Sequence, residues 1–382
     1  MKKHFRLHAA VFLPLLALCM AGSVQAADKK SPAKAAKLAQ AASSADNVGE
    51  FANFGDWQDV NAFIDMMVAK HGFIRKNLEA TFKNAHYVAS AVQLVKPAPG
   101  GQAKNWQAYR ARFVEPIRIA AGVAFWNSHA EALAREEREY GVPAEIVIGI
   151  LGIESLFGRN TGNFRVMDVL TTLAFAYPET PTRTARMEYF RSELESALLF
   201  ARESDIDPFT LHGSYAGAIG YPQFMPASIR KYAVDYDGDG KIDLRNSPDD
   251  AIGSVGNFLV QHGWRRGEPT VFAASVATPV DNNQANNWPS YIGQGLEAKF
   301  KLDELKAAGV QPAVEPPADM LYGLVDLQNG TEPTEYWLGA PNFFAITQYN
   351  RSYFYAMSVI ELSKAVRSAR DGDENCVGDR IR

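Results

Sequence analysis

The sequence predicts a mainly α-helical fold with a smaller β portion, an α+β class, and two observations carry this prediction. Over most of the 382 residues, 47% of which are hydrophobic, apolar side chains recur at the spacing of one helix face. The segment 269–341 differs, because it is rich in Pro, Gly and Asn and contains short β-branched or aromatic runs such as TVFAASV and YWLGAP. A chain of this size can bury a large core and is expected to divide into two or three lobes.

Residues 1–26 have the pattern of a secretory signal peptide. Three basic residues precede an apolar run over 9–21 that is too short to span a membrane as a permanent helix. The run leads into Val24-Gln25-Ala26, with small residues at the two positions that a signal peptidase reads. We therefore expect a periplasmic protein. An outer-membrane lipoprotein anchored through Cys19 is the alternative, which the bulky Leu18 before it disfavours.

Removal of this peptide would take away Lys2, Lys3 and Arg6 and no acidic residue, so the formal net charge would move from -4 to -7. An exported protein of this charge is a poor candidate for binding nucleic acid. Cys19 would be lost as well, which leaves Cys376 as the only thiol and excludes an intrachain disulfide. No organic cofactor is expected.

The elements of the mature chain follow in order. A flexible leader over 27–50 consists mostly of Ala, Lys and Ser. An N-terminal helical region is predicted over 51–140, with one helix from Asp56, one over 78–95 and a long helical stretch over 117–140.

Beyond residue 140 the pattern predicts further helices from Pro143 and over 188–203, 250–261 and 352–366. The expected divisions are the first part of a catalytic core over 141–232, a metal loop over 233–250, a core helix over 251–268, a mixed accessory segment over 269–341, a C-terminal core segment over 342–370 and a tail over 371–382.

The stretch EIVIGILGIESLFGRN, 145–160, places the carboxylate of Glu154 inside an apolar helix. An ionised carboxylate that is buried without partners is costly, and its pKa usually rises in response. A carboxyl that stays protonated near neutral pH can act as a general acid. By itself, however, the segment favours the plainer interpretation of a helix-end Glu that reaches solvent or pairs with Arg159.

A second stretch, HGSYAGAIGYPQFMPASIRKYA over 212–233, combines small residues with aromatic and amide side chains. The small residues permit close backbone approach, so a sugar ring or an extended chain could lie against the main chain. A tight interhelical loop is the equally good structural alternative.

The stretch DYDGDGKIDLRN, 235–246, follows an EF-hand calcium loop almost position for position, with Gly240 at the turn. Its candidate ligands are Asp235, Asp237, Asp239, the backbone carbonyl of Lys241, Asp243 and Asn246. Because Asn246 replaces the usual bidentate Glu, we expect weaker binding, with Asp249 or Asp250 as alternatives for this ligand. We predict a structural calcium ion, or alternatively sodium, with no part in catalysis. A solvated Asp/Gly-rich turn is the other interpretation.

Three stretches in this order resemble the lytic transglycosylase B family of murein-degrading enzymes. They are GIES around Glu154, GSYAGAIGYPQFMPAS, and FFAITQYNRSYFYAMSVIEL over 343–362, and the resemblance extends from about residue 51 to 365. It implies a lysozyme-like core with a deep cleft, an additional helical lobe and a small EF-hand-like calcium-binding lobe.

On the matching positions, the resemblance implies that Glu154 is the catalytic acid and then the base. The implied substrate-binding residues are Ser214, Tyr221, Gln223, Tyr349, Asn350 and Tyr355, together with Arg186, which fits the position of a family arginine better than Arg183 does. Phe258 departs from the family, because some relatives carry Tyr there.

The implied reaction cleaves the β-1,4 bond between N-acetylmuramic acid and N-acetylglucosamine and forms 1,6-anhydromuramyl ends, with a single Glu as acid and base. Two alternatives stay open: a hydrolytic muramidase that uses water with Asp168 or Glu188 as a second carboxylate, and a non-catalytic peptidoglycan-binding protein. The expected partners are peptidoglycan glycan strands and, further, cell-wall synthesis proteins. A monomer is expected.

Overall fold

The protein is represented by a computed structural model that describes residues 54–97, 103–277 and 286–372. The predicted signal peptide and the leader over 27–50 lie outside these residues, as do Cys19, Cys376 and nearly all of the predicted tail. Within the described ranges, no helix combines the length and the hydropathy needed to cross a bilayer.

Helices make up most of the regular secondary structure of the described chain and a small set of strands the remainder, as the sequence predicts. The helices are η2 (Phe54–Asp56), α2 (Gln58–His71), α3 (Arg75–Lys83), α4 (Ala89–Leu94), α5 (Trp106–Arg110), α6 (Pro116–Ser128), α7 (Ala130–Tyr140), α8 (Ala144–Ser155), α9 (Val166–Phe175), α10 (Arg183–Glu203), η3 (Pro208–Thr210), α11 (Pro226–Tyr232), α12 (Pro248–Gln261), η5 (Trp288–Tyr291), α13 (Leu302–Ala307), α14 (Pro341–Thr347) and α15 (Tyr353–Asp371). The strands are β1 (Phe164–Arg165), β2 (His212–Gly213), β3 (Val271–Val276), β4 (Phe300–Lys301), β5 (Val310–Pro312), β6 (Leu321–Asn329) and β7 (Glu332–Gly339).

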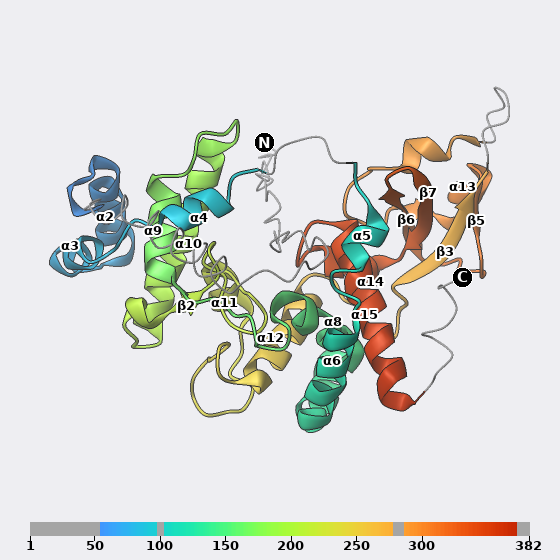
Figure 1. Ribbon diagram of the computed structural model, residues 1–382, viewed down its shortest axis with the longest axis horizontal. Helices are drawn as coiled ribbons and strands as arrows, with labels where there is room; N and C mark the ends of the chain where they lie inside the picture. The colour runs from blue at the N-terminus through green and yellow to red at the C-terminus, as the bar shows by residue number, and fades with distance from the viewer. Residues whose placement is uncertain (1–53, 98–102, 278–285, 373–382) are drawn as a thin grey trace, which may run out of the picture.

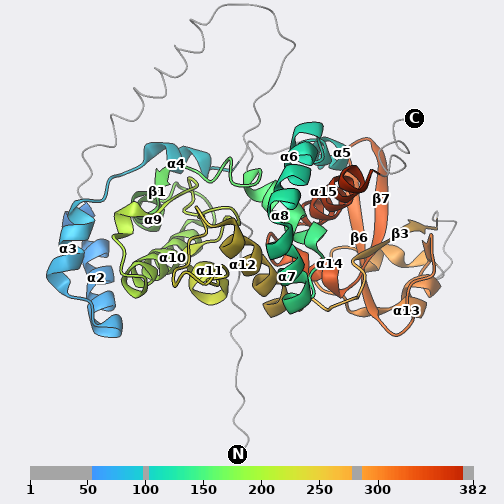
Figure 2. The same ribbon diagram turned by 90° about the horizontal axis from the view of Figure 1, so that it is seen from below.

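Helix α8 lies in the middle of the molecule, between the α2–α3 pair at one end and the strands β3 to β7 at the other (Figures 1 and 2). It packs against α6, α7, α12 and α15. A helix that is apolar on all sides must be surrounded in this way, because each of its faces has to leave water.

Two glycines let α15 approach α8 closely. A Cβ at Gly149 would lie 2.6 Å from the carbonyl oxygen of Val359 and would overlap the Ser363 hydroxyl. A Cβ at Gly152 would lie 2.8 Å from a methyl group of Leu362. The distance between these helices is therefore set by the absence of side chains at two positions in the sequence run that carries Glu154.

The α2–α3 pair packs on α9 through aromatic contacts, and α2 is joined to α10 by ion pairs to Glu195. The rings of Phe63, Phe82 and Phe175 meet edge to face, with centroids 5.9 to 6.5 Å apart. The single helix predicted over 78–95 is wrong, because α3 ends at Lys83 and α4 begins only at Ala89. In the break, the backbone N–H groups of His86 and Val88 donate to α9 side chains instead of to a helical carbonyl.

The stretch predicted over 117–140 is helical but not continuous. His129 ends α6 and precedes α7 with φ −121° and ψ 30°. Its ring lies 4.5 Å from that of Phe125 and 3.5 Å from a carboxylate oxygen of Asp249, at the start of α12. The chain bends here because α7 packs on α12 as well as on α8.

The Pro/Gly-rich segment forms an antiparallel five-stranded sheet in the order β4-β6-β7-β3-β5. One face of β6 and β7, with Val325 and Trp337, joins the large core shared with the helices. The other face, with Leu324 and Leu338, forms a second, smaller core with α13. The alternation of these residues along β6 and β7 follows from the two-residue period of a strand.

Candidate active site

Glu154 lies in the last turn of α8, where the helix stops abruptly. Leu156 and Phe157 have φ of 51° and 55°, and Gly158 follows with 82°, so three consecutive residues are left-handed. Each non-glycine residue in this conformation costs on the order of 1–3 kcal/mol, and such strain gathers at functional sites. The sharp exit ends the helix and leaves the Glu154 side chain half-buried.

Two tyrosines from the C-terminal part of the chain meet Glu154. The hydroxyl of Tyr355, in the first turn of α15, donates a hydrogen bond of 2.6 Å to Glu154 Oε1. The ring of Tyr349 stacks on that of Tyr355, with centroids 6.3 Å apart and an interplanar angle of 14°. The Tyr349 hydroxyl donates to the carbonyl of Pro222 at 2.6 Å, which joins this pair to the segment 213–224.

The environment of Glu154 raises the pKa of its carboxyl, so that the protonated form is still well populated at neutral pH. Burial raises its pKa to about 7, and the hydrogen bond from Tyr355 lowers the pKa only in part. No charged residue in the described part of the chain contributes to this shift. The interpretation of Glu154 as the partner of Arg159 does not hold, because Arg159 is exposed and makes no ion pair with it.

We call residues 213–224 the small-residue segment. It passes beside the exit of α8, where the ring of Tyr221 lies over Gly158 so closely that a Cβ there would overlap the ring. Gln223 has a left-handed φ of 51°, and its Nε2 donates to the carbonyls of Gly220 (2.8 Å) and Thr161 (3.2 Å). The Ser214 hydroxyl accepts from the backbone N–H of Ala218 at 3.1 Å. These contacts hold a tight turn against the end of the helix.

The two other predicted binding residues fall in different places. Asn350 directly follows Tyr349 in the connection between α14 and α15, and is half-buried. Arg186 lies in the first turn of α10, where its Nε donates to the Tyr177 hydroxyl at 3.3 Å. The described contacts of Arg186 do not connect it with Glu154.

Two residues at this site were not singled out from the sequence. Ser155 is 1% exposed, and its Oγ accepts from the Gly158 N–H at 2.9 Å and donates to the Tyr221 carbonyl at 2.8 Å. Burial and then the Glu154 carboxylate raise the pKa of Tyr355, and the hydroxyl of Tyr109 in α5 makes a smaller contribution in the same direction. The spacing of aromatic residues over 106–113 is the available signal for Tyr109, and by itself it predicts only core packing.

The two carboxylates considered as second catalytic groups have other surroundings. Asp168 is buried and accepts from Arg165 Nε at 2.6 Å and from the backbone N–H of His86 at 3.0 Å. Glu188 is exposed on α10. Neither contributes to the pKa shift of Glu154.

Asp250 is the last residue of the metal loop, residues 233–250, and takes part in its structure. Carboxylate oxygens of Asp235, Asp237 and Asp250 lie within 4.8 Å of one another, a grouping that could hold a cation. Asp250 is 1% exposed and lies in the first turn of α12, and its oxygens accept from the backbone N–H groups of Tyr236 and Asp243, both at 2.7 Å. Asn246 instead donates its amide to Asp243 at 2.9 Å. The geometry therefore favours Asp250 over Asn246 as the acidic group that closes the loop.

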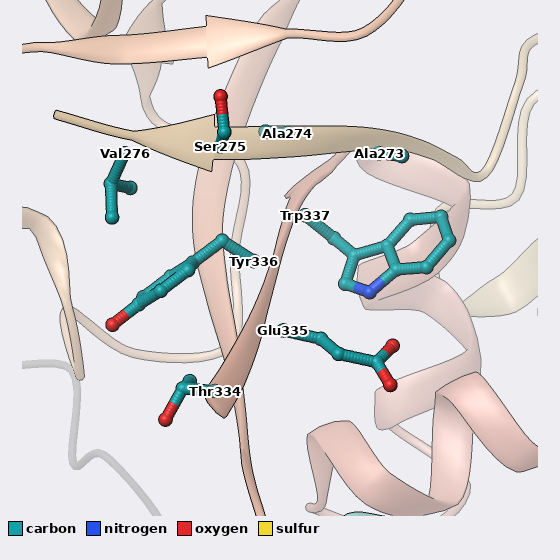
Figure 3. Close-up of a pocket in the computed structure, with 8 residues that line it drawn as sticks. All are labelled: Ala273, Ala274, Ser275, Val276, Thr334, Glu335, Tyr336 and Trp337. Carbon is teal, nitrogen blue, oxygen red and sulfur yellow. The ribbon is translucent and has the colours of Figure 1, made fainter. Parts of the chain in front are cut away.

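A pocket lies on the sheet, away from these residues (Figure 3). It is lined by 273–276 of β3 and 334–337 of β7. The pairing of β3 with β7 ends at Ala274 and Tyr336, beyond which Ser275 and Val276 pair only with β5. The pocket thus marks the point where two strands separate, and none of its lining residues belongs to the site around Glu154.

A carboxyl that is protonated near neutral pH, bound by a tyrosine and free of an ionised partner, is equipped to protonate a glycosidic oxygen. A helical core that holds such a carboxyl has the general acid that an enzyme cleaving glycosidic bonds requires.

Known proteins identify the class more closely. A family model described as the transglycosylase SLT domain matches residues 55–364. The membrane-bound lytic murein transglycosylase B of Escherichia coli (strain K12) is 43% identical over 331 residues, which cover 84% of this chain and 85% of that protein.

Two solved structures are similar over almost the same range. The catenated lytic transglycosylase SltB1 of Pseudomonas aeruginosa has a TM-score of 0.75 and 42% identity, covering 83% of this chain and 99% of that one. The Escherichia coli lytic transglycosylase Slt35 in complex with calcium has a TM-score of 0.72 and 40% identity, covering 85% and 97%. The chain belongs to the transglycosylase SLT domain family, and it is a peptidoglycan lytic transglycosylase with a mainly helical, lysozyme-like fold.

Proposed function

We propose that Glu154 carries out both proton transfers of the transglycosylase reaction. In the first, it donates its proton to the oxygen between N-acetylmuramic acid and N-acetylglucosamine, and the bond from that oxygen to the muramic C1 breaks. In the second, the C6 hydroxyl of the same muramic residue attacks C1 and gives its proton to Glu154. The product ends in a 1,6-anhydro ring, and the carboxyl returns to its starting state.

The observation that carries this proposal is that no second carboxylate in the described chain affects the pKa of Glu154. Glycosidases that use water or form a covalent intermediate place a second carboxylate opposite the acid. Here burial and one tyrosine account for the pKa of about 7, with no contribution from another carboxylate in the described chain. The substrate can take the place of the second carboxylate and of water, because its N-acetyl carbonyl can stabilise the cation at C1 and its C6 hydroxyl can act as the nucleophile.

The proposed roles of the neighbouring residues follow from their positions. Tyr355 orients the carboxyl, since its hydroxyl donates to Glu154 directly. The other proposed contacts hold the sugar and its N-acetyl group, and their residues are Ser214, Tyr221, Gln223, Tyr349 and Asn350. The hydrolytic alternative is not favoured, because Asp168 is engaged by Arg165 and Glu188 is exposed on α10.

The experiment is a digest of purified murein glycan by the wild-type enzyme and by Glu154→Gln, followed by mass spectrometry. The wild type should release ends that are one water lighter than ordinary reducing ends. Glu154→Gln keeps the shape and removes the acid, so its rate should fall by at least about 100-fold. The matched control Glu188→Gln should stay active. Reducing ends from the wild type, or full activity of Glu154→Gln, would contradict the proposal.

We further propose that the metal loop holds a structural calcium ion through Asp235, Asp237 and Asp250. Hard cations of this kind prefer carboxylate and carbonyl oxygens, and the three carboxylates already lie within reach of one point. The related Slt35 structure in complex with calcium supports the choice of ion. The ion, with its two positive charges, would offset the repulsion among the three converging carboxylates and take no part in proton transfer.

We propose a periplasmic location and glycan strands of murein as the binding partner. The signal-peptide pattern of residues 1–26 supports export, and a murein-degrading activity requires access to the cell wall. Lipid anchoring through Cys19 stays the disfavoured alternative, while association with cell-wall synthesis proteins and a monomeric state stay predictions from the sequence.

A further inference from the structure

We propose that the metal loop holds the small-residue segment in place through Leu244 and Arg245, so that an ion in the loop and a glycan at Glu154 strengthen each other's binding. The inference rests on the proposed function of both sites and assigns Leu244 and Arg245 as positioning residues. Neither residue is a candidate ligand of the ion, and neither touches Glu154 in the described contacts.

The first link is a main-chain contact. The carbonyl of Leu244 accepts a hydrogen bond of 2.8 Å from the backbone N–H of Tyr221. Gly220, with φ 74°, allows this approach, because any Cβ there would overlap the Leu244 carbonyl. Leu244 is itself 3% exposed. The loop and the small-residue segment are therefore packed backbone to backbone.

The second link is the side chain of Arg245. Its Nη1 donates to the carbonyls of Gly162 (2.8 Å) and His212 (3.2 Å), and its Nη2 donates to Asn163 Oδ1 at 3.1 Å. Gly162 lies just before β1, and His212 lies in β2, which pairs with β1 and leads into Ser214. One planar guanidinium thus joins the two segments, which is a use of arginine that lysine cannot reproduce.

The same two segments position Gln223. Its Nε2 is held by the carbonyls of Thr161, next to Gly162, and of Gly220, next to the Leu244 contact. A shift of the metal loop would move both of these acceptors. Such a shift would remove contacts that hold Gln223 in its left-handed backbone conformation, because a strained conformation persists only when its surroundings hold it.

Within the metal loop, Asp243 connects Leu244 and Arg245 to the proposed ion-binding carboxylates. The backbone N–H of Asp243 donates to Asp250 Oδ2 at 2.7 Å. The carboxylate of Asp243 accepts from the backbone N–H of Arg245 at 3.0 Å. An ion that draws Asp250 toward Asp235 and Asp237 would therefore fix the main chain at 243–245. Without the ion, repulsion among the three carboxylates works against that arrangement.

Such a link has a thermodynamic consequence. If the ion stabilises the conformation that binds glycan, glycan must raise the affinity for the ion by the same factor. Couplings of this kind usually amount to about 5-fold to 150-fold in affinity. We therefore expect calcium to slow hydrogen exchange in the small-residue segment even when no substrate is present.

Hydrogen exchange of the full chain, read by mass spectrometry with calcium and with a chelator, tests the proposal. In the wild type, calcium should slow exchange in the metal loop and, by at least about fivefold, at 213–224. In Arg245→Met, calcium should still protect the loop but protect 213–224 less than in the wild type, because only the main-chain link through Leu244 remains. Arg230→Met serves as the matched control, since Arg230 pairs with Glu203 on the surface, and it should behave as the wild type. Asp250→Asn should weaken protection of both regions.

Three results would overturn the proposal: calcium that protects neither region, calcium that protects only the loop in the wild type, or an undiminished effect on 213–224 in Arg245→Met. If Arg245→Met does not fold, Arg245→Lys takes its place. It keeps the positive charge but not the planar guanidinium, so the effect of calcium on exchange at 213–224 should be reduced. The measurement needs neither glycan nor turnover. An inactive enzyme would therefore contradict the proposed function and leave this result standing.

Discussion

At the scale of single residues, Glu154 and Tyr355 have opposing effects that determine the acidity of the site. Burial raises the pKa of Glu154 to about 7, while the Tyr355 hydroxyl stabilises the ionised form and lowers it. Tyr355 is separated from Glu154 by 201 positions in the chain. The acid is thus tuned by a residue whose proximity no local sequence pattern reveals.

Replacing Tyr355 by Phe should slow the reaction and shift its pH dependence. The hydrogen bond to a charged group contributes about 1.5–3 kcal/mol, so we expect kcat to fall by about tenfold or more. Loss of a donor to the carboxylate raises the pKa of Glu154 further. The decline of activity on the alkaline side, where the acid loses its proton, should therefore begin at higher pH.

A pH–rate profile of murein digestion measures this shift. Tyr353→Phe is the matched control, because its hydroxyl bonds the Gly295 carbonyl and not Glu154. An alkaline limb that stays in place in Tyr355→Phe would show that Tyr355 does not tune the acid.

At the scale of elements, the packing of α8 against α15 decides where Glu154 meets Tyr355. The sequence contains glycines at 149 and 152 but does not reveal that they permit close helix packing, since a glycine inside a helix is usually just a weak helix former. The structure gives the reason for Gly149: the Val359 carbonyl and the Ser363 hydroxyl occupy the space of a side chain.

Gly149→Ala should therefore destabilise the protein although alanine favours helices. Overpacking of this kind typically costs about 1–3 kcal/mol, against a gain of up to about 1 kcal/mol in helix propensity. Denaturant unfolding of Gly149→Ala should show a net loss. Adding Ser363→Ala should restore only part of it, because the Val359 backbone oxygen stays. A variant as stable as the wild type would mean that the two helices can move apart freely.

The breaks in the helices also belong to this scale. Periodicity predicted one helix over 78–95 and helical structure over 117–140 without a break at residue 129, because apolar spacing continues across both breaks. The break after Lys83 is stabilised by Asp168 and Thr172 of α9, and the bend at His129 by packing on α12. Both partners are distant in sequence, so tertiary contacts override the local pattern.

At the scale of the whole molecule, Glu136 makes stability depend on pH. It is fully buried between α7 and α12, where Gly256 makes room for its carboxyl, and neither oxygen has a hydrogen-bond partner among the described residues. Burial is the main cause that raises its pKa to about 9. The folded protein therefore holds this proton at pH values where the unfolded chain releases it.

The sign of the effect follows from this difference. Below pH 4.5 both states are protonated and the contribution of Glu136 to stability is fully present; it is lost progressively as pH rises toward 9. The loss between pH 4.5 and 7 is on the order of 3 kcal/mol. Glu136→Gln should remove this slope, so the free energy of unfolding should fall less between pH 5 and 8 than in the wild type.

Urea unfolding at the two pH values checks this expectation. Glu131→Gln, an exposed change on the same helix, should keep the wild-type slope. Equal slopes in Glu136→Gln and the wild type would show that Glu136 is not the group responsible.

The sequence by itself determined the mainly helical class, the apolar helix around Glu154 and the alternating acidic residues of the metal loop. These features are local, since periodicity and ligand spacing depend on residues within a few turns of one another. The resemblance of three motifs to a known family also predicted the activity, and the related proteins confirm that prediction.

Only the tertiary structure decided which residues surround the acid and how the loop is closed. The Tyr355 hydroxyl on Glu154, the Asp250 carboxylate beside Asp235 and the Arg245 guanidinium on the small-residue segment all join parts of the chain that periodicity treats separately. The physical reason is that the pKa of a buried carboxyl and the geometry of an ion site depend on what packing brings within a few ångströms. Packing is a property of the whole fold.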